Sequence, residues 1–410
     1  MIDLVFITES YPYNDAKEAT FIEPELECYF NELYSEKINI TFLPLRFEKA
    51  EEEKGLVVST LLRDILNNKI TLVSKVLIFN QLYKELFIRL FSKKGKCNLL
   101  KDIKAIVNWS FKYQATMKAL SKLIENSEKK KMCIYSYWFN GCTSAAIDFN
   151  KKYLTNSKVI TRAHGYDLYN AIGWQTRRAY DIECLDSVYP VSIAGKKELQ
   201  KLKDSKNIKT LYLGVKGIDF FGKEKQFCEN EIRVCSCSYI VPVKRVPLLL
   251  EGLVCLSEQY RDKKIQWEHY GNGADSSLIE NLIKRIPGNL EVILKGEVDN
   301  YEIRNSMHAN NYSAFVNTSS SEGLPVSLME ALEAGIPLVA TDVGGCSEIV
   351  SEDVGRLIAE NPTPSEIADA IYVCHENRHD LSLKALQNWK ERFNSEINHK
   401  SFFNDIIGFF

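Results

Sequence analysis

The chain has 410 residues, of which 45% are hydrophobic and 26% charged, and its formal net charge is −2. This composition excludes a disordered or fibrous protein, and the length predicts two domains because a single core rarely grows so large. A nearly neutral chain gives no reason to expect nucleic acid as a partner, and no apolar stretch approaches the roughly 20 residues of a membrane span. The first residues lack the basic start of a signal peptide and the eleven cysteines are irregularly spaced, so we expect a cytoplasmic protein with free thiols.

Short β-branched or aromatic runs alternate with amphipathic segments along most of the chain, which is typical of parallel sheets with crossover helices. In the first half, strands are predicted at 4–8, 38–45, 132–137, 158–163, 187–191 and 210–213. In the second half, they are predicted at 232–238, 265–270, 290–295, 314–317, 338–341 and 356–359. A charged stretch with glycines at 216–231 separates the two series and is predicted to be a linker.

The predicted fold class is therefore α/β, with two doubly wound Rossmann-like domains that face each other across a cleft. The first domain is predicted to cover residues 1–215 and the second residues 216–390. Residues 391–410 are predicted to form a C-terminal helix that packs back on the first domain. Ligands are expected at the carboxyl ends of the strands.

One segment of the first domain, residues 56–131, lacks strand-like alternation and has long helical patterns, so we predict a helical insertion. It contains sixteen Lys and Arg residues against five Asp and Glu, a surplus of eleven positive charges in a nearly neutral protein. The basic residues include Lys93, Lys94 and Lys96, and aromatic residues are interleaved with them. The segment fits two interpretations: a surface for an anionic membrane, or solvated helices that pack their aromatic side chains inside.

Two glutamates, Glu322 and Glu330, lie in a predicted strand–turn–helix unit. An apolar run at 312–316 predicts the strand, and the spacing of apolar residues over 324–334 predicts the helix. Gly323 would let the backbone approach a ligand closely, and the helix N-terminus behind it would favour an anion. Carboxylates that hold hydroxyl groups beside amides that hold phosphate predict a nucleotide-sugar site.

The same stretch resembles the donor-site signature of the family 4 glycosyltransferases, which are retaining enzymes with the two-Rossmann-domain GT-B architecture. The resemblance is carried by SEGLP (321–325), AGIP (334–337) and DVGG (342–345), and is supported by SYIVPVKR (238–245), YGNG (270–273), KGEV (295–298) and LGV (213–215). In the first domain, TESYP (8–12), EATFI (18–22) and AHGYD (163–167) are similar to a subgroup that builds exopolysaccharide and O-antigen repeat units.

The resemblance implies a role for each residue at the donor site. Glu330 would accept both ribose hydroxyls, and Glu322 would bind donor-sugar hydroxyls nearest the reacting carbon. The amides of Gly323 and Leu324 would hold the diphosphate. Lys244 would offset the charge that develops on the leaving diphosphate. Two purely structural alternatives remain open. Glu322 also fits a helix-capping acid, and Glu330 also fits a solvated helix glutamate.

Further positions follow from the same motifs. Gly271, Val298 and Arg245 are expected to contact the nucleotide, although Arg245 fits an ordinary surface residue equally well. The family usually has an arginine five residues before the lysine, where this chain has Tyr239, so this chain departs from the pattern by one cation that would neutralise the phosphates. His164 would contact the donor sugar or line the acceptor side, with a packed core histidine as the alternative. Its neighbour Asp167 would either position His164 or cap the next helix.

The sequence contains no Asp-x-Asp motif and no His or Cys pair with metal-ligand spacing, so we expect a metal-independent reaction without a cofactor. The resemblance implies a retaining glycosyltransferase that uses a nucleotide-sugar donor, a UDP-sugar in preference to a GDP-sugar. The expected acceptor is a growing glycan, in particular a lipid-linked one at the inner face of the cell membrane. Two other functions remain open: a sugar-nucleotide epimerase of the same architecture, and a non-catalytic scaffold that binds nucleotide sugars.

Overall fold

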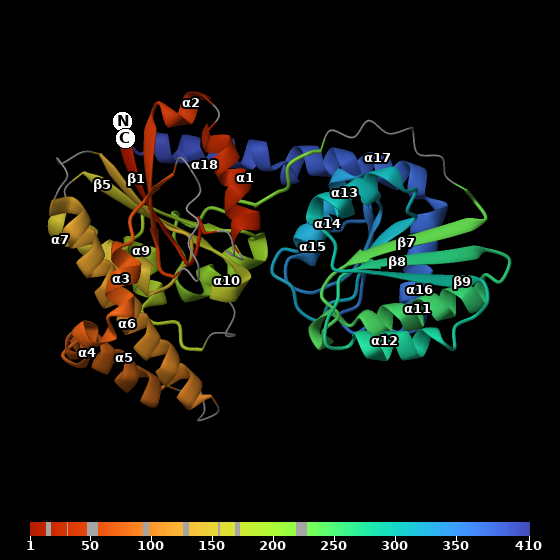
Figure 1. Cartoon of the computed structure of the whole chain (residues 1–410), viewed down its shortest axis with the longest axis horizontal. Coiled ribbons are helices and arrows are strands. Elements are labelled where there is room, and N and C mark those ends of the chain that lie inside the picture. The colour runs from red at the N-terminus through yellow and green to blue at the C-terminus, as the bar shows by residue number, and fades with distance from the viewer. Residues whose placement is uncertain are drawn as a thin grey trace. The chain divides into compact units, whose positions relative to one another are not determined.

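The computed structural model describes residues 1–13, 18–30, 32–46, 56–92, 98–125, 131–154, 156–168, 173–218 and 228–410. The chain forms two compact units (Figure 1). The first unit comprises residues 1–213 together with 396–410, and the second comprises residues 214–395. The chain thus enters the second unit at Gly214 and leaves it before Glu396, whereas the sequence predicted these changes at residues 216 and 391.

The first unit is built on a parallel sheet with the strand order β3-β2-β1-β4-β5-β6, the order of the Rossmann fold. Its strands are β1 (Ile2–Thr8), β2 (Ile38–Pro44), β3 (Val57–Val58), β4 (Met132–Ser136), β5 (Ser157–Ala163) and β6 (Ser187–Pro190). The predicted strand at 210–213 is wrong. The amides of Lys209 and Leu211 bond to carbonyls of β6, but the segment forms only an isolated bridge at the edge of the sheet.

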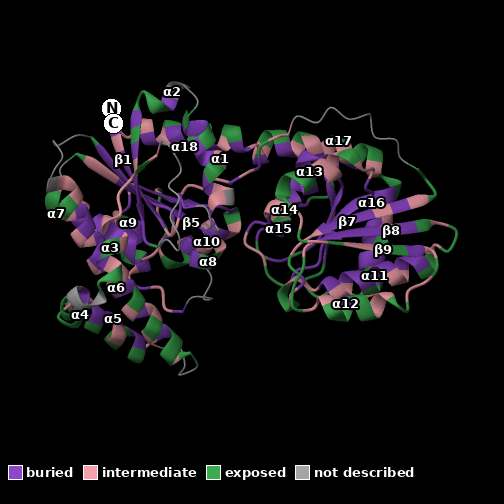
Figure 2. Ribbon diagram, viewed as in Figure 1, coloured by how far each residue is buried: buried purple, intermediate pink, exposed green. Residues whose placement is uncertain are grey.

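The second unit repeats this topology, with the strand order β12-β11-β10-β7-β8-β9. Its strands are β7 (Glu231–Cys237), β8 (Lys264–Tyr270), β9 (Leu290–Gly296), β10 (Ala314–Asn317), β11 (Leu338–Thr341) and β12 (Gly355–Ile358). Its helices are α11 (Val246–Gln259), α12 (Ser276–Ile283), α13 (Asn300–Ala309), α14 (Val326–Glu333), α15 (Cys346–Ile349), α16 (Pro364–Glu376) and α17 (Arg378–Asn388). Helices cover both faces of the sheet, which explains why the strand sequences are apolar runs (Figure 2). Two doubly wound sheets confirm the predicted fold class.

In the described residues, the helices of the first unit are α1 (Ala19–Phe30), α2 (Glu32–Ser35), α3 (Leu61–Asn67), α4 (Lys69–Leu77), α5 (Asn80–Leu90), α6 (Leu99–Glu125), α7 (Gly141–Tyr153), α8 (Gly165–Leu168), α9 (Arg178–Cys184), α10 (Ile193–Leu202) and α18 (Ser395–Gly408). Of these, α3 to α6 lie in the segment that was predicted to be a helical insertion. Within the described part of the chain, no helix combines the length and the apolarity needed to cross a bilayer. Lys93, Lys94 and Lys96 lie outside the described residues.

Helix α18 packs on the first unit through Phe402, Phe403 and Ile406, which are buried in one of its cores. A fully buried ion pair lies beside them, in which Arg162 on β5 donates to Glu25 on α1 at 2.8 Å. Such a pair makes the local packing sensitive to substitution, since removing one partner of a buried pair typically costs about 3–5 kcal/mol. The Glu25 carboxylate is thus part of the core.

Candidate functional site

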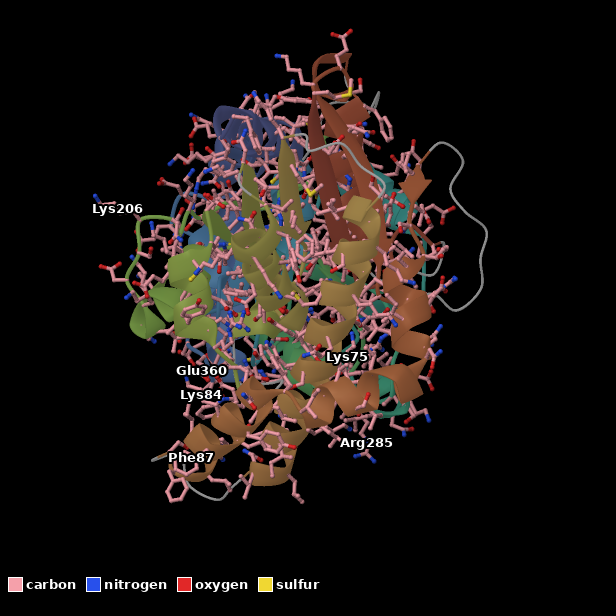
Figure 3. All side chains as sticks on the ribbon, turned by 90° about the vertical axis from the view of Figure 1, so that its left-hand side faces the viewer. Lys75, Lys84, Phe87, Lys206, Arg285 and Glu360 are labelled. Carbon is pink, nitrogen blue, oxygen red and sulfur yellow. The ribbon has the colours of Figure 1, made fainter. Side chains whose placement is uncertain are left out.

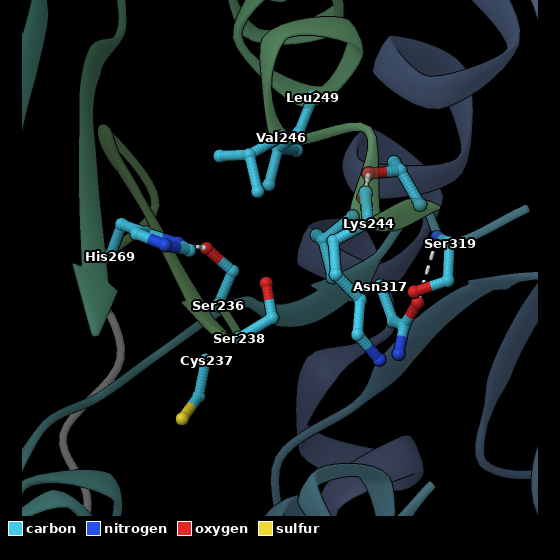
Figure 4. Close-up of a pocket in the computed structure, with 11 residues that line it drawn as sticks. Ser236, Cys237, Ser238, Lys244, Val246, Leu249, His269, Asn317 and Ser319 are labelled. Carbon is cyan, nitrogen blue, oxygen red and sulfur yellow. Dashed lines mark hydrogen bonds between the residues drawn. The ribbon is translucent and has the colours of Figure 1, made fainter. Parts of the chain in front are cut away.

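The site lies in the second unit, at the carboxyl ends of β7 and β10. These two strands are neighbours in the sheet, and the strand order reverses between them. Open α/β sheets bind ligands in the crevice at such a reversal. A pocket opens there (Figure 4), lined by residues at and just after the ends of β7 and β10, by one residue of β8, and by residues at and before the start of α11. The lining residues are Ser236, Cys237, Ser238, Lys244, Val246, Leu249, His269, Val316, Asn317, Thr318 and Ser319.

Lys244 and Glu322, which the sequence predicted as catalytic residues, are in direct contact. Lys244 ends a short 3-10 turn before α11, and its Nζ donates to Glu322 Oε1 at 2.6 Å. The same oxygen accepts from Ser319 Oγ at 2.6 Å and from Asn317 Nδ2 at 3.1 Å. Among the described residues, no donor contacts the other oxygen, Oε2. One half of the carboxylate is therefore fixed by the protein, and the other half can accept a hydroxyl of a ligand.

Glu330 is buried within α14, so the alternative of a solvated helix glutamate is wrong. The residue is 6% exposed and its Oε1 accepts a hydrogen bond of 2.9 Å from Asn300 Nδ2, at the start of α13. Burial raises the pKa of Glu330, although the bond from Asn300 and the charge of Arg304 oppose the shift. No donor among the described residues contacts Oε2 of Glu330. A desolvated carboxylate with one open oxygen is suited to bind hydroxyl groups that donate to it.

The turn that carries Glu322 differs from the predicted one. Helix α14 begins at Val326, not at residue 324, and no side chain caps it. Gly323 and Leu324 therefore lie in the turn before the helix, and Glu322 is not a helix cap. The role of their amides in holding a diphosphate remains a prediction.

The DVGG motif supports this turn from a neighbouring loop. Gly344 has a φ of 54°, and a Cβ atom there would lie 1.8 Å from the carbonyl oxygen of Glu322. The amide of Gly345 donates to the carbonyl of Gly323 at 2.7 Å. Only glycine permits both the backbone conformation and the close approach. These two glycines thus hold the Glu322 turn in place and need not contact a ligand.

Gly271 lies beside the pocket residue Ser238, and Val298 lies on the loop that follows the neighbouring strand β9. Gly271 follows β8 with a φ of 130°, and a Cβ atom there would lie 2.0 Å from the carbonyl oxygen of Ser238. Val298 is half-buried in the loop between β9 and α13. The geometry explains why residue 271 is glycine, whereas contact of either residue with a nucleotide remains a prediction.

The side chain of Arg245 binds protein oxygens. Its guanidinium donates to the carbonyls of Thr318, Ser319 and Glu360 at 2.7, 2.9 and 2.7 Å, and to Asn361 Oδ1 at 3.1 Å. Four of its five N–H groups are thereby occupied, which leaves little capacity for a phosphate. This geometry favours a role for Arg245 in joining the loops after β10 and β12, and its contact with the donor remains a prediction.

Tyr239 occupies the position where the family usually has an arginine, and its side chain is 70% exposed. A tyrosine side chain cannot supply the positive charge of an arginine. Lys244 is thus the cation that the described residues place in the pocket.

His164 lies in the first unit, directly after β5, and is buried against the rings of Tyr137 and Trp138 at centroid distances of 4.7 and 4.6 Å. Burial, together with the charge of Arg162, lowers the pKa of His164 to about 3, so the imidazole is neutral at neutral pH. Its Nε2 has no hydrogen-bond partner among the described residues. Asp167 accepts from the main-chain N–H of His164 at 3.1 Å, so it fixes the backbone and not the imidazole.

Three polar residues of the site were not predicted: Asn317 and Ser319, which bind Glu322, and Asn300, which binds Glu330. Their polarity at strand and helix ends was the available signal. No group of three or more His, Cys, Asp or Glu side chains in the described ranges is arranged to hold a metal ion. The expectation of a metal-independent reaction thus remains a prediction.

Residues 218–395 match the family model of the glycosyl transferases, group 1. The matched region contains the whole pocket and both glutamates. It corresponds closely to the second unit, so the likeness to this family model falls on the unit that carries the candidate site.

Two curated relatives match parts of the chain. A poly(ribitol-phosphate) alpha-N-acetylglucosaminyltransferase of Staphylococcus aureus is 23% identical over 258 residues, which are 60% of this chain and 51% of the relative. The O-antigen biosynthesis glycosyltransferase WbnH of Escherichia coli is 32% identical over 159 residues, which are 37% of this chain and 42% of the relative. The chain thus spans about half the length of the curated relatives it matches.

A solved structure of similar fold extends the likeness to both units. HepE of Anabaena, crystallised in complex with UDP, aligns with 100% of this chain and 100% of its own, with a TM-score of 0.64 and 13% sequence identity. At this identity the likeness establishes the fold alone, which is the two-Rossmann-domain fold of GT-B glycosyltransferases.

Proposed function

We propose that this chain is a retaining, metal-independent glycosyltransferase of family 4 that uses a nucleotide-sugar donor. The proposed donor is a UDP-sugar, in preference to a GDP-sugar, and the proposed acceptor is a hydroxyl of a growing, lipid-linked surface glycan. The observation that carries the proposal is the pairing of Lys244 with Glu322 at the strand-order reversal, beside the buried carboxylate of Glu330. The curated relatives, which are named for transfer to poly(ribitol phosphate) and for O-antigen synthesis, support it.

The arrangement assigns each group a task. Oε2 of Glu330 would accept the ribose hydroxyls, and Oε2 of Glu322 would accept a hydroxyl of the donor sugar. Lys244 would turn from Glu322 towards the diphosphate as negative charge accumulates on the leaving oxygen, and so stabilise the transition state more than the ground state. In a retaining reaction by same-face attack, the departing phosphate takes the acceptor proton, so no separate general base is required.

The two alternatives stand differently. A sugar-nucleotide epimerase is disfavoured because the relatives are named as glycosyltransferases. A non-catalytic scaffold would bind the nucleotide without turnover. We further propose a cytoplasmic location at the inner face of the cell membrane, because a lipid-linked acceptor would be presented there.

The test is a panel of UDP- and GDP-sugars incubated with the purified chain, with release of the nucleoside diphosphate followed by a coupled assay. A glycosyltransferase is expected to hydrolyse its own donor slowly without an acceptor and to release the sugar first as the donor's anomer. Interconversion of nucleotide sugars without release would instead indicate an epimerase. Stabilisation by a nucleotide sugar without any turnover, even with extracted lipid-linked glycans, would indicate a scaffold.

A further inference from the structure

Helices α4 and α5 of the first unit expose an unusual number of large apolar side chains. Ile78 between the helices is 77% exposed and Phe91 after α5 is 75% exposed. The most exposed members, which we call the apolar face, are Leu77, Ile78, Tyr83, Phe87, Leu90 and Phe91. Figure 3 shows Phe87 projecting from the end of this helical pair, with Lys84 close by on the same helix.

The apolar face is continuous. Tyr83, Phe87 and Phe91 are spaced four residues apart, so they lie along one side of the helix and its end. The rings of Phe87 and Phe91 are in contact, with centroids 4.5 Å apart. The hydroxyl of Tyr83 donates to the main-chain carbonyl of Leu77 and thereby joins the face to the end of α4.

The opposite side of α5 buries two of the three charged residues of this helix. Leu82, Glu85 and Arg89 are the buried residues of this helix. Glu85 accepts a hydrogen bond of 2.9 Å from Trp174 Nε1, and Arg89 forms a buried ion pair with Asp102 on α6. In a solvated surface helix the charges face water and the apolar residues face the core. Helix α5 departs from this arrangement, because Glu85 and Arg89 are buried while Phe87 and Leu90 are exposed, although Lys84 does face water.

The exposed charges on the helices that carry the apolar face and at the start of α6 are positive, and the exposed Asp64 of the preceding helix α3 is paired with Arg63. Within residues 72–92 and 98–104, the exposed charged residues are Lys75, Lys84, Lys101 and Lys104, whereas Glu85 and Asp102 are buried. Aromatic and aliphatic side chains bordered by lysines match the interface of a bilayer with anionic headgroups. A protein partner would more commonly meet charges of both signs at the rim.

We propose that the apolar face docks on an anionic lipid bilayer, with Phe87 and Phe91 below the headgroups and the lysines at lipid phosphates. The proposal names the residues through which the basic segment would contact a membrane. It rests on the proposed function only in that a lipid-linked acceptor would explain why the enzyme binds a bilayer. Three other aromatic residues of the segment, Phe79, Trp109 and Tyr113, pack on one another inside the unit. The segment therefore has both the internally packed aromatic residues of the solvated-helix interpretation and an exposed face that fits the membrane interpretation.

The test is sedimentation of the full chain with vesicles of phosphatidylcholine, alone or mixed with phosphatidylglycerol. We expect the chain to bind the mixed vesicles at least about tenfold more tightly than the neutral ones, and more weakly at high salt. The double variants Phe87→Ser/Phe91→Ser and Lys75→Glu/Lys84→Glu should each weaken binding about tenfold or more. All four residues are exposed, so the variants should fold normally.

Matched controls replace exposed residues outside the face. Leu383 on α17 is 62% exposed, and Lys206 in the first unit is exposed, so Leu383→Ser and Lys206→Glu should bind vesicles as the parent chain does. Equal binding of all variants would overturn the proposal. So would a dimer, measured by light scattering without vesicles, that dissociates in Phe87→Ser/Phe91→Ser, because the face would then belong to a second copy of the chain.

The same samples separate this proposal from the proposed function. Binding of UDP is measured by calorimetry for the parent chain and for both double variants, and we expect it to be unchanged. Vesicle binding without UDP binding would contradict the proposed function while leaving the docking surface in place. UDP binding without selective vesicle binding would contradict the docking surface while leaving the proposed function in place.

Discussion

Lys244 Nζ lies 2.6 Å from Glu322 Oε1, although the two residues are 78 positions apart in the chain. The contact brings together the turn before α11 and the turn before α14, and it places one cation and one anion at the reversal of the strand order. A diphosphate that enters the pocket must compete with Glu322 for Lys244. The lysine is therefore held near its place of action before the ligand arrives, which lowers the cost of reorganisation in the reaction.

The first prediction concerns Lys244→Ala. It should lower kcat by roughly 10²–10³-fold, because the charge on the leaving diphosphate grows as the glycosidic bond breaks. The dissociation constant for the donor should rise less than kcat falls, since the lysine acts mainly in the transition state. Steady-state kinetics of donor hydrolysis, with calorimetry of donor binding, measure both. Normal turnover with weaker binding would show that Lys244 only clamps the ground state.

A second prediction separates Arg245 from its neighbour. Arg245→Lys keeps the charge but loses the planar fork that reaches four oxygens, so the second unit should lose about 1–3 kcal/mol of unfolding free energy. Affinity for UDP should change little, because the guanidinium is committed to the loops after β10 and β12. Denaturant unfolding and calorimetry check the two effects. A large loss of affinity with unchanged stability would restore the role in phosphate binding.

Chelation provides a third prediction. Because Lys244 occupies the position that neutralises charge, donor hydrolysis should continue at the same rate in excess EDTA. The coupled assay is run before and after chelation, and again after addition of Mn²⁺ or Mg²⁺. Loss of activity in EDTA with rescue by a divalent cation would contradict the assignment of this task to lysine.

The raised pKa of Glu330 leads to a fourth prediction. Burial raises this pKa above its ordinary value of 4.5, and the protonated carboxyl must lose its proton before it accepts two ribose hydroxyls. Donor affinity should therefore be full above the pKa and fall as the pH is lowered through it, by up to about tenfold per pH unit. A UDP-sugar is the suitable probe, because its phosphates have no proton that titrates in this range. Glu330→Gln should remove this part of the pH dependence, and an identical profile in both proteins would contradict the assignment.

The strands were predictable where the apolar run itself decides the structure. The runs at 232–238 and 314–317 form β7 and β10, which are buried between helices on both faces. The run at 210–213 was predicted to be a strand for the same reason, but it lies at the edge of β6, where only single hydrogen bonds form. Strand β3 has two residues, too few to leave a pattern.

The candidate site was predictable as a set of residues but not as a set of contacts. The sequence motifs predicted Glu322, Glu330 and Lys244. The contacts of Lys244 with Glu322 and of Asn300 with Glu330 depend on turns that are distant in the chain. Arg245 shows the limit most clearly. Its φ of 50° is in the left-handed region, and its side chain reaches the loop carbonyls while that of the adjacent Lys244 binds Glu322. The sequence alone gave no indication that these two adjacent side chains point to different partners.

The burial of charge in α5 was equally hidden from the sequence. Glu85 and Arg89 look like solvent-facing residues, because the cost of burying them depends on Trp174 and Asp102 as partners. These partners lie 89 and 13 positions away. Periodicity alone cannot identify such partners, so the exposure of Phe87 and Phe91 became visible only in the folded chain.

The central claim is that the pocket between β7 and β10 binds the nucleotide of a sugar donor through Glu330. The most direct test is calorimetric titration of UDP into the parent chain, Glu330→Ala and the control Glu280→Ala, which changes an exposed residue of α12. We predict that the parent and Glu280→Ala bind UDP equally well. Glu330→Ala should lose about 1.5–3 kcal/mol, a roughly ten- to hundredfold weaker Kd. Equal affinity of Glu330→Ala and the parent chain, or no UDP binding by any of the three proteins, would contradict the account.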